Sequence, residues 1–375
     1  MSASLYVLNP DREAPWNQLP DLPIAPGLHE TLPVYKQLGA AKEALGRLHG
    51  RSVAIPDPAL LITSLSLQEA RASSAIENIF TTDDELYRAF SDGQQVQPEG
   101  PVKEVLRYRE ALGEGVGYLR QHPRFTRDYF VRIFQTVKQT SDGIRPPQAQ
   151  VRILQAGSGP GAGRVVYTPP RGAGVLEAKL DNLCAFLNAT DDGLDPLLKM
   201  AIAHYQFEAI HPFRDGTGRT GRIFNLHYLT QQRLLDQPTL YLSRYILAHK
   251  TDYYAALAGV SQRADWPTWL LFMLRAVAET ANSTFDKIDR ILAAQAAVLA
   301  LVAREKTIRR PELLVQKIFT QPITRVRHLT ADGSFAQNTA RTYLNRLAEL
   351  RLLQKSTLRG NDYYLNPELY SILAD

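Results

Sequence analysis

The chain has 375 residues, 45% of them hydrophobic, and carries a formal net charge of +5. This length and apolar content predict a substantial core in two or three domains, and the modest positive charge suits a polyanionic ligand without requiring one. Cys184 is the only cysteine, which excludes an intrachain disulfide and a cysteine-based zinc site. The start of the chain lacks the pattern of a signal peptide, and no apolar run reaches the roughly 20 residues of a membrane span. We therefore expect a soluble cytoplasmic protein with no membrane partner.

The N-terminal region is predicted to be an extended arm followed by helices. Six prolines fall within the first 35 residues, where they disfavour regular structure. Helical patterning then covers residues 34–48 and about 60–77. Asn78 is suited to the left-handed conformation that ends a helix, and Thr82 with Glu85 predicts a capping box for the next helix.

Glu77 carries a negative charge at a position where the helix disfavours one. It falls in the last turn of a predicted helix, where the helix dipole disfavours a carboxylate by about 0.3–1 kcal/mol. Such a charge predicts a cationic partner elsewhere in the fold. The alternative from this local argument is a solvated glutamate at a helix end.

Two amphipathic helices, residues 102–119 and 127–140, precede a predicted β-hairpin. Residues 151–154 and 164–168 are predicted to be two short strands around the glycine-rich turn 157–163. That turn is not a P-loop, because it lacks the Gly-Lys-Ser/Thr ending and no helix follows it directly. Further helices are predicted at residues 175–187 and 195–210.

Residues 211–222 read HPFRDGTGRTGR and join two predicted helices. A short glycine-bearing loop that enters a helix N-terminus exposes backbone N–H groups and the positive dipole end, which together hold anions. Arg219 and Arg222 are three residues apart and share one face of the first turn. Asp215 offers hard oxygen ligands for a phosphate-bound Mg²⁺, and His211 can take a proton near neutral pH. Glu208 and His211 have the spacing of a di-iron ligand pair, but no second Glu-x-x-His occurs in the chain.

These twelve residues resemble the motif of the Fic (Fido) family, His-x-Phe-x-Asp/Glu-Gly-Asn-Gly-Arg-x-x-Arg. The resemblance covers roughly residues 60–280. It implies a mainly α fold, a Fic helical core with a β-hairpin flap. It also implies transfer of AMP from ATP to a hydroxyl of a target protein, or the reversal of that transfer, with Mg²⁺ as cofactor. The one departure is Thr217, where the family usually has Asn. A hydroxyl is shorter than an amide and has one donor instead of two, so we expect activity to be reduced or retuned.

The resemblance assigns roles by position. His211 is implied to deprotonate the target hydroxyl and Asp215 to hold Mg²⁺. The implied phosphate and ATP contacts are Gly216, Thr217, Gly218, Arg219, Thr220, Gly221 and Arg222, with Asn225 supporting the motif helix and Tyr253 touching the adenine. The alternative for Tyr253 is an ordinary core aromatic. The hairpin residues Val165, Val166 and Tyr167 are implied to contact the target by strand addition.

Residues 73–78 resemble the inhibitory motif of the family, Ser/Thr-x-x-x-Glu-Gly/Asn. The resemblance implies that Glu77 pairs with Arg222 and so withdraws that arginine from the γ-phosphate. Ser73 lies one turn earlier on the same face and would support the docking of the helix. A carboxylate beside the site could also orient water for removal of AMP, and the sequence leaves the two roles open.

The last part of the chain is predicted to be a winged helix. A helix at residues 268–280 and an alanine-rich connecting helix at 281–305 lead to segments 311–319 and 323–329. Ser334 and Gln337 are expected to cap a third helix that ends near residue 350, followed by a hairpin over residues 352–364. This third helix shows Asn338, Arg341, Asn345 and Arg346 outward. Such a face can read a DNA major groove, but we favour a solvated face used for dimerisation or target docking, because a winged helix does not fix function.

The expected organisation is an N-terminal arm with an inhibitory helix (1–100), a Fic catalytic core (101–280), and a connecting helix with a winged-helix domain (281–375). The expected activity is that of an adenylyltransferase restrained by Glu77. The alternatives are an enzyme that mainly removes AMP, and a weakly active core that serves a DNA-binding regulator.

Overall fold

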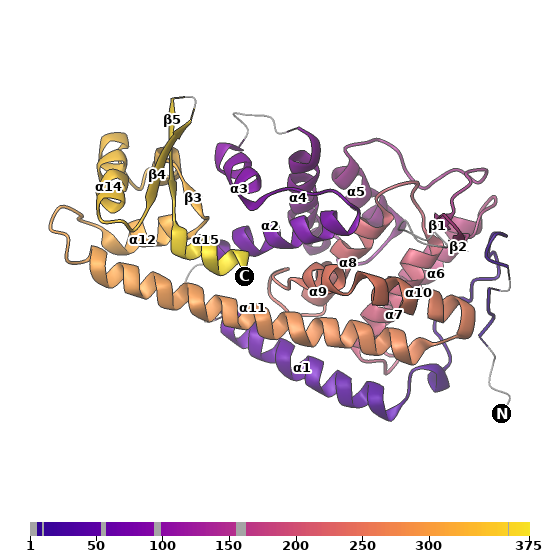
Figure 1. Cartoon of the computed structure of the whole chain (residues 1–375). Coiled ribbons are helices and arrows are strands. Elements are labelled where there is room, and N and C mark those ends of the chain that lie inside the picture. Colours follow the sequence, from indigo (N-terminus) through magenta and orange to yellow (C-terminus); the bar gives the residue numbers. More distant parts are fainter. Residues whose placement is uncertain (1–5, 10, 54–57, 94–98, 155–162, 359) are drawn as a thin grey trace.

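The computed structural model describes residues 6–9, 11–53, 58–93, 99–154, 163–358 and 360–375. The fold is mainly helical, with two small antiparallel sheets (Figure 1). Within these ranges no helix has the length and apolar character needed to cross a membrane.

Two buried helices form the centre of the molecule. α7 (Pro196–Ile210) has buried residues on all sides, as expected of a helix enclosed by others, and α8 (Thr217–Gln231) is buried along most of its length. α4 (Gly100–Gln121), α5 (Arg127–Lys138) and α6 (Val175–Asn188) pack against this pair. The rings of Phe130 and Phe207 stack with centroids 4.7 Å apart between α5 and α7. The loop that joins α7 to α8 is therefore held on both sides by rigid helices.

A long helix runs along one side of the molecule. α11 (Trp266–Val302) lies beside α1 (Leu32–Val53), as Figure 1 shows along its lower edge. The prediction of two helices meeting at residue 280 is wrong, because residues 268–302 contain no glycine or proline and the buried face continues as far as Ile291. The expected domain division at residue 280 falls inside this helix.

The segment that carries Glu77 joins two helices above α8. α2 (Pro58–Ile76) is followed by Asn78 with a φ of 62°, and α3 (Asp83–Asp92) begins with the expected capping box of Thr82 and Glu85. α2 packs against α4 and against α9 (Leu242–Ala248), which precedes α10 (Lys250–Arg263). These contacts place the C-terminal end of α2 near the start of α8.

A two-stranded sheet lies at one end of the molecule. β1 (Ile153–Leu154) pairs antiparallel with β2 (Val165–Tyr167), so the expected hairpin is present. Most of its predicted glycine-rich turn, residues 155–162, lies outside the described residues. The N-terminal arm, with the 3₁₀ turn Pro26–Leu28, runs over the core, and Trp16 is buried edge-on against the Tyr167 ring at a centroid distance of 5.9 Å.

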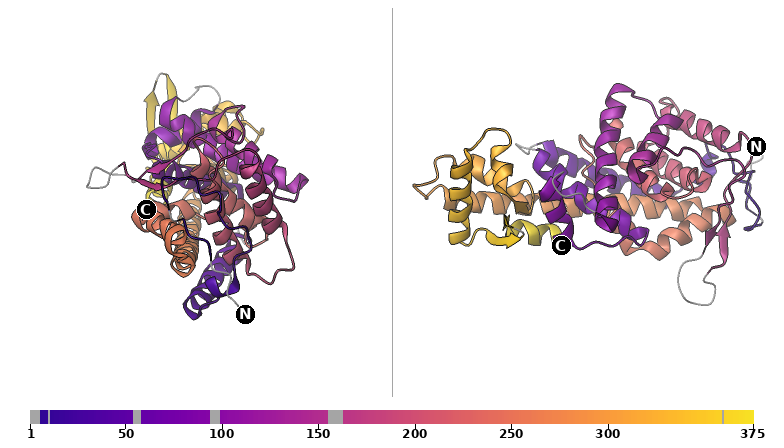
Figure 2. Two further views of the ribbon diagram at one scale, coloured as in Figure 1. Left: turned by 90° about the vertical axis from the view of Figure 1, so that its right-hand side faces the viewer. Right: turned by 90° about the horizontal axis from the view of Figure 1, so that it is seen from above.

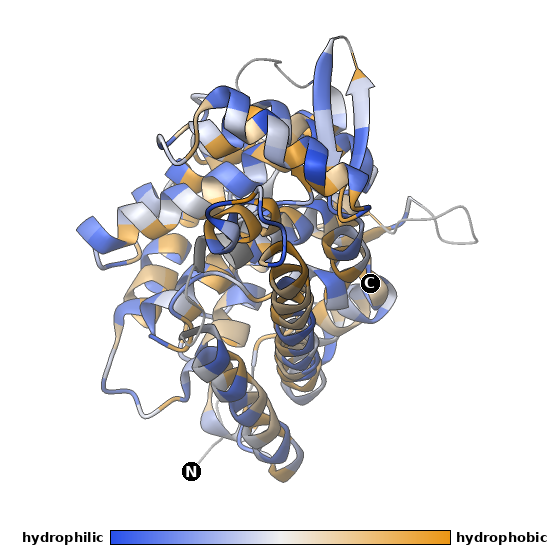
Figure 3. Cartoon of the chain, turned by 90° about the vertical axis from the view of Figure 1, so that its left-hand side faces the viewer, coloured by the Kyte–Doolittle hydropathy of each residue, from blue (hydrophilic) through white to orange (hydrophobic). Residues whose placement is uncertain are grey.

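The C-terminal elements have the order of a winged helix. They are α12 (Pro311–Phe319), β3 (Ile323–Thr324), α13 (Val326–Thr330), α14 (Gln337–Glu349), β4 (Gln354–Leu358) and β5 (Asn361–Leu365), followed by α15 (Pro367–Ala374). The sheet order is β3-β5-β4. Figure 2 shows these elements at one end of the molecule and the β1–β2 sheet at the other. Every residue of β4 is exposed, and Figure 3 shows the hairpin as largely hydrophilic.

Two details of this domain differ from expectation. The N-cap of α14 is Ala336, which makes no side-chain cap, so the predicted cap by Ser334 is wrong. The Arg346 guanidinium is bonded to Glu305 at 3.0 Å and to Glu349 at 2.9 Å. The Asn345 amide oxygen accepts bonds from Lys355 and Tyr364. Two of the four outward groups expected on α14 are thus engaged within the domain.

Candidate active site

The loop between α7 and α8 reverses the chain through two left-handed residues. His211 ends α7 with a φ of 48°, and Gly216 precedes α8 with a φ of 88°. Positive φ is uncommon for a residue with a side chain, so His211 is held in place by its surroundings. Phe213, between them, stacks on Phe134 of α5 with centroids 4.0 Å apart and an interplanar angle of 6°. The loop is therefore a fixed structure with its motif residues at defined positions.

Arg145 is the side chain that holds this loop from outside the motif. Its Nε donates to the His211 carbonyl oxygen at 2.8 Å, and its Nη2 donates to the Pro170 carbonyl oxygen at 2.5 Å. Its backbone N–H donates to the Pro212 carbonyl oxygen at 2.9 Å. Arg145 is 3% exposed. Sequence reasoning missed this residue, because it lies 66 positions before His211 in a proline-rich stretch without periodicity.

The His211 ring is suited to accept a proton. Burial and, to a smaller extent, the positive charge of Arg145 lower its pKa to about 4, while Glu77 and Asp215 act in the opposite direction. The imidazole is therefore neutral at pH 7. A neutral ring nitrogen is the form that a general base requires.

Glu77 and Arg222 form an ion pair across the site. Arg222 Nη2 lies 2.7 Å from Glu77 Oε1 and donates to the Ser73 carbonyl oxygen at 3.0 Å, and Arg222 Nε donates to the Ser73 hydroxyl at 2.7 Å. The Arg222 side chain is 2% exposed and that of Glu77 is 35% exposed. Both residues of the expected inhibitory motif thus reach the motif arginine.

Each member of this pair stabilises the charged form of the other. Burial would raise the pKa of Glu77, but the attraction of Arg222, its hydrogen bond, and the more distant Arg219 and Lys250 lower it below its usual value. Burial would lower the pKa of Arg222, and Glu77 outweighs that effect and raises it. Glu77 is therefore a carboxylate and Arg222 a guanidinium cation throughout the neutral pH range.

The Glu77 carboxylate lies against the first turn of α8. A Cβ placed on Gly218 would lie 2.5 Å from Glu77 Oε1 and 3.0 Å from Arg222 Nη1. The free N–H groups and the positive dipole end of a helix N-terminus bind anions at such a position. Glu77 thus occupies the anion-binding end of α8, and a side chain at position 218 would displace its carboxylate.

Two motif hydroxyls brace the loop internally. The Thr217 hydroxyl donates to the Phe213 carbonyl oxygen at 3.2 Å and accepts from the Phe213 N–H at 3.3 Å. The Thr220 hydroxyl donates to the Gly216 carbonyl oxygen at 3.0 Å. Both side chains are buried, so the expected phosphate contact of Thr217 through its hydroxyl does not fit this geometry. Backbone N–H groups remain as the donors that Thr217 and Thr220 can offer a ligand.

Asp215 is the motif carboxylate open to solvent. Its side chain is 69% exposed, and its Oδ2 lies 2.6 Å from Lys138 Nζ. Burial would raise its pKa, but the hydrogen bond and charge of Lys138 and the charge of Arg219 lower it. The described residues contain no group of three potential metal-ligating side chains. A single carboxylate suits Mg²⁺, which usually takes one or two protein carboxylates and completes its shell with phosphate and water.

Glu208 is a further acidic group at the site. A Cβ on Gly221 would lie 2.5 Å from Glu208 Oε1, so this carboxyl of α7 lies against the first turns of α8. Burial raises the pKa of Glu208 to about 8, with Arg222 acting against and Glu77 acting with that effect. Glu208 Oε1 has no hydrogen-bond partner among the described residues. The carboxyl is therefore largely protonated at pH 7, one helical turn before His211.

The expected aromatic contacts need correction. Tyr253 is 1% exposed, and its hydroxyl lies 2.9 Å from His204 Nε2, so its ring belongs to the core and is not free to touch an adenine. The neighbouring Tyr254 is 39% exposed. After burial, the charges of Glu77 and Arg222 have the largest effects on the pKa of its hydroxyl. Helical periodicity does not decide which of two adjacent tyrosines faces a site. Asn225 is fully buried, and its amide has no partner among the described residues.

The hairpin residues also divide between core and surface. The Tyr167 hydroxyl donates to the Ala209 carbonyl oxygen at 2.8 Å, and the residue is 8% exposed. Tyr167 therefore anchors the sheet on α7 with its side chain, which leaves its backbone as the part that can contact a target by strand addition. Val165 and Val166 are half-buried and remain open to strand addition.

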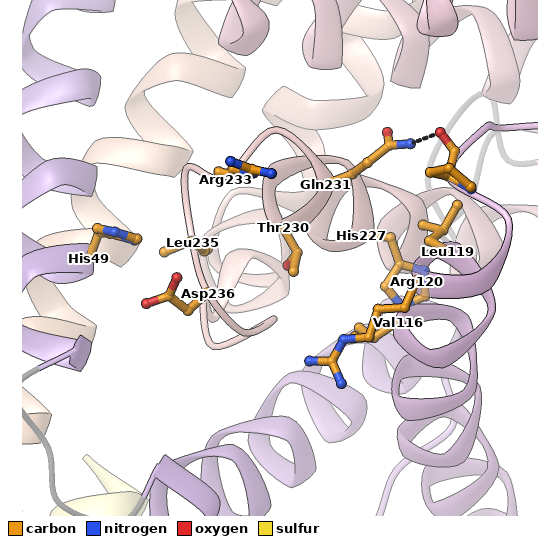
Figure 4. A pocket seen from close by; sticks show the side chains of 11 residues that line it. His49, Val116, Leu119, Arg120, His227, Thr230, Gln231, Arg233, Leu235 and Asp236 are labelled. Carbon is orange, nitrogen blue, oxygen red and sulfur yellow. Dashed lines mark hydrogen bonds between the residues drawn. The ribbon is translucent and has the colours of Figure 1, made fainter.

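A separate cavity of about 600 Å³ lies at the other end of α8 (Figure 4). His49, Arg120, His227 and Arg233 line it, and none of residues 211–222 does. Both ring nitrogens of His227 are engaged, Nδ1 with the Tyr129 hydroxyl at 2.6 Å and Nε2 with the Leu112 carbonyl oxygen at 2.8 Å. The cavity is thus separate from the motif loop, whose titratable residues lie at the start of α8.

Comparisons with known proteins place the chain in a family. Three family models match the chain: the Fic/DOC family N-terminal model at residues 35–117, the Fic/DOC family model at 120–229, and the C-terminal domain of SoFic-like protein adenylyltransferases at 300–369. The protein adenylyltransferases fic-1 of Caenorhabditis briggsae and Caenorhabditis elegans are 28% identical over 131 residues and 25% identical over 132 residues. Each alignment covers 33% of this chain and 24% of the relative, so the chain spans about a quarter of the length of these proteins.

Solved structures show the same fold. A Fic family protein from Desulfovibrio desulfuricans is 20% identical with a TM-score of 0.57, and the match covers 89% of this chain and 96% of that one. Fic-1 from C. elegans is 20% identical with a TM-score of 0.51, covering 68% of this chain and 71% of that one. At this level of identity the likeness concerns the fold. The two Fic/DOC family models, which follow one another from residue 35 to residue 229 and together cover about half of the chain, show that the chain belongs to the Fic/DOC family.

Proposed function

We propose that the chain is a protein adenylyltransferase, which transfers AMP from ATP to a hydroxyl side chain of a target protein and is restrained by Glu77. The observation that carries this proposal is the ionised Glu77 carboxylate at the N-terminus of α8, bonded to Arg222 beside the neutral His211 ring. An anion held there by a helix end and an arginine has the chemistry of a bound phosphate. The names of the fic-1 relatives support the same reaction.

The residues present can carry out each part of the transfer. The target hydroxyl oxygen attacks the α-phosphorus of ATP, the bond to the leaving diphosphate breaks, and the hydroxyl proton passes to His211. Backbone N–H groups at the start of α8, with Arg219 and Arg222, bind the phosphates and the charge that develops on them. Mg²⁺ would be held by Asp215 and would neutralise charge on the phosphate oxygens. Arg145 keeps the loop in position while His211 accepts the proton.

The restraint follows from competition for one position. While Glu77 is bonded to Arg222 at 2.7 Å, the guanidinium and the start of α8 are both occupied by a carboxylate. A triphosphate must displace that carboxylate to reach the same groups. Movement of the end of α2 away from α8 would therefore turn the activity on.

Removal of AMP is the second activity that the site can support. Glu77 is ionised and close enough to His211 to raise its pKa, so a water between them could be oriented for attack on an AMP ester. Regulation through DNA has less support, because Asn345 and Arg346 of α14 are bonded within the domain.

Incubation with α-labelled ATP tests the proposal through self-modification. Glu77→Gly should incorporate at least about tenfold more label than the unaltered chain, which corresponds to ~1.4 kcal/mol of inhibition. His211→Ala should incorporate none, and Glu13→Gly, which removes an exposed glutamate of the arm, should behave as the parent. Equal labelling of Glu77→Gly and parent, or persistent labelling of His211→Ala, contradicts the proposal. Release of AMP from labelled protein that is lost in Glu77→Gln would assign the reverse activity.

A further inference from the structure

Four charged side chains form a ring at the mouth of the motif loop. Arg219 Nη1 lies 2.6 Å from Glu104 Oε2, and the same oxygen lies 3.9 Å from Lys138 Nζ. Lys138 Nζ is 2.6 Å from Asp215 Oδ2, and Asp215 Oδ1 is 3.9 Å from Arg219 Nη2. The charges alternate around the ring. It is separate from the Glu77–Arg222 pair, and sequence reasoning identified neither Glu104 nor Lys138.

Lys138 is placed on the loop itself. It is the last residue of α5. Its Cγ and Cδ would lie 3.1 and 3.2 Å from a Cβ on Gly216, so its aliphatic chain packs against the left-handed glycine that precedes α8. Its ammonium group then lies beside Asp215, the residue suited to hold a metal. The Lys138 side chain is 25% exposed and so can exchange partners. Arg219, at 1% exposed, is fixed by comparison.

We infer that Lys138 is a third phosphate-binding cation, together with Arg219 and Arg222, in the adenylyl transfer proposed above. Without nucleotide, its ammonium group neutralises Asp215. When the triphosphate binds, Lys138 bonds to a non-bridging phosphate oxygen and leaves the Asp215 oxygens to the metal that accompanies the phosphates. Glu104 stays on Arg219 and keeps that guanidinium directed at the loop.

The inference is tested by nucleotide binding in the full chain, with His211→Ala to stop turnover and Glu77→Gly to free Arg222. In this background, calorimetric titration with ATP and Mg²⁺ should show about tenfold weaker binding for Lys138→Met. Lys138→Arg should retain most of the affinity, because it keeps the charge. Adenosine, which has no phosphate, should bind equally to all variants. Lys36→Met, which removes an exposed lysine of α1, is the matched control for net charge.

Two results would overturn the role of Lys138. One is ATP affinity within twofold of the parent in Lys138→Met, and the other is an equal loss of ATP and adenosine binding, which would assign Lys138 a packing role. If the parent background itself does not bind ATP, the proposed function fails with it. If the parent binds ATP and Lys138→Met binds it equally well, only the role of Lys138 fails.

A second inference rests on different contacts, those between the winged-helix domain and the helices that flank Glu77. Arg325 Nη1 lies 2.6 Å from Asp92 Oδ1 at the end of α3. Arg327 donates to the Ser91 carbonyl oxygen, and His328 Nε2 lies 3.1 Å from the same oxygen. The C-terminal end of α3 is therefore bonded to the N-cap and first turn of α13.

The rest of α3 and α2 is tied into the same assembly. The Tyr370 ring of α15 packs edge-on against Tyr87 of α3 at 5.9 Å, and the Tyr87 hydroxyl accepts from Gln68 of α2 at 2.7 Å. Arg71 of α2 pairs with Asp83 of α3 at 2.7 Å. The two helices are thus joined to each other by side-chain contacts, and Glu77 lies in the turn between them.

We propose that the winged-helix domain holds Glu77 on Arg222 through α3, so that loosening of the α3–α13 contact weakens the restraint proposed above. The domain would then pass a signal to the site by moving α2 and α3, with no residue of its own in the catalytic loop. A partner that binds the domain and moves α13 would have the same effect.

The test compares Arg325→Ala/Arg327→Ala with Arg309→Ala/Arg341→Ala, which removes two exposed arginines of the same domain. Hydrogen exchange of the amides at residues 74–92 should become faster in the first variant only, and self-labelling should rise about threefold to tenfold. In a Glu77→Gly background the same pair should add nothing, because the restraint is already absent. Arg325→Lys gives a milder version should the double variant unfold.

Faster exchange without more label would overturn this second inference, and so would an equal rise of label in the Glu77→Gly background. Unchanged exchange would overturn it as well. The labelling of Glu77→Gly relative to the parent tests the proposed function alone, so the failure of that function and the failure of this inference are distinguishable.

Discussion

Gly218 shows how one missing Cβ couples the catalytic helix to its inhibitor. The position has an ordinary helical φ, so alanine would be favoured there over glycine by about 0.5–1 kcal/mol from helix propensity alone. The Glu77 carboxylate prevents this gain, because Oε1 would lie 2.5 Å from the new Cβ. The effect of alanine at 218 thus depends on the side chain at 77.

Gly218→Ala should therefore change sign between two backgrounds. In the parent it should lower the free energy of unfolding, because Glu77 must leave its position on Arg222. In Glu77→Gly it should raise the free energy of unfolding by several tenths of a kcal/mol through helix propensity. The coupling, measured by denaturant unfolding of the four proteins in a double-mutant cycle, should be about 1–2 kcal/mol. Additive effects would mean that Glu77 does not contact position 218 in solution.

At the residue scale, the site residues inside the motif could be predicted from the sequence, and several of those outside it could not. The alternation of glycines and arginines from Asp215 to Arg222 predicted a loop that enters a helix, and the dipole argument at Glu77 predicted a cationic partner. Arg145 and Glu104 carry no such pattern. They are brought to the loop by the packing of separate elements, and their partners lie 66 and 115 positions away in the chain.

At the scale of elements, the predictions succeeded where local chemistry decides. The capping box of Thr82 and Glu85 and the left-handed Asn78 follow from side-chain hydrogen bonds and backbone preference, and both are present. The break expected at residue 280 and the cap expected from Ser334 failed. A helix continues where tertiary packing stabilises it and no glycine or proline interrupts it. The local sequence does not show where that packing occurs.

The tyrosines illustrate the same limit. Tyr253 and Tyr254 are adjacent on α10, and the core takes the first while the second stays exposed near Glu77. Adjacent residues on a helix point about 100° apart, so which one meets a ligand depends on the rotation of the helix against its neighbours. Tyr253 faces the core here, where its ring lies 5.7 Å from the ring of Trp269.

At the scale of the whole molecule, residues from four separate segments meet at the start of α8. The turn after α2 brings Glu77, α4 brings Glu104, α5 brings Lys138, and α8 itself carries both motif arginines. Cations and carboxylates are matched one to one around the loop, so the resting site has no unpaired charge on Arg219, Arg222 or Lys138. A polyanionic nucleotide must exchange these partners, which makes the site responsive to anything that moves α2.

The most direct test of this account is the affinity for ATP with Mg²⁺, measured by calorimetry on the full chain carrying His211→Ala, with and without Glu77→Gly. If the Glu77 carboxylate holds the position of a phosphate, its removal should tighten ATP binding by about tenfold and leave adenosine binding unchanged. Equal affinity for ATP in the two proteins would contradict the account, because Glu77 and the phosphates would then not compete for Arg222.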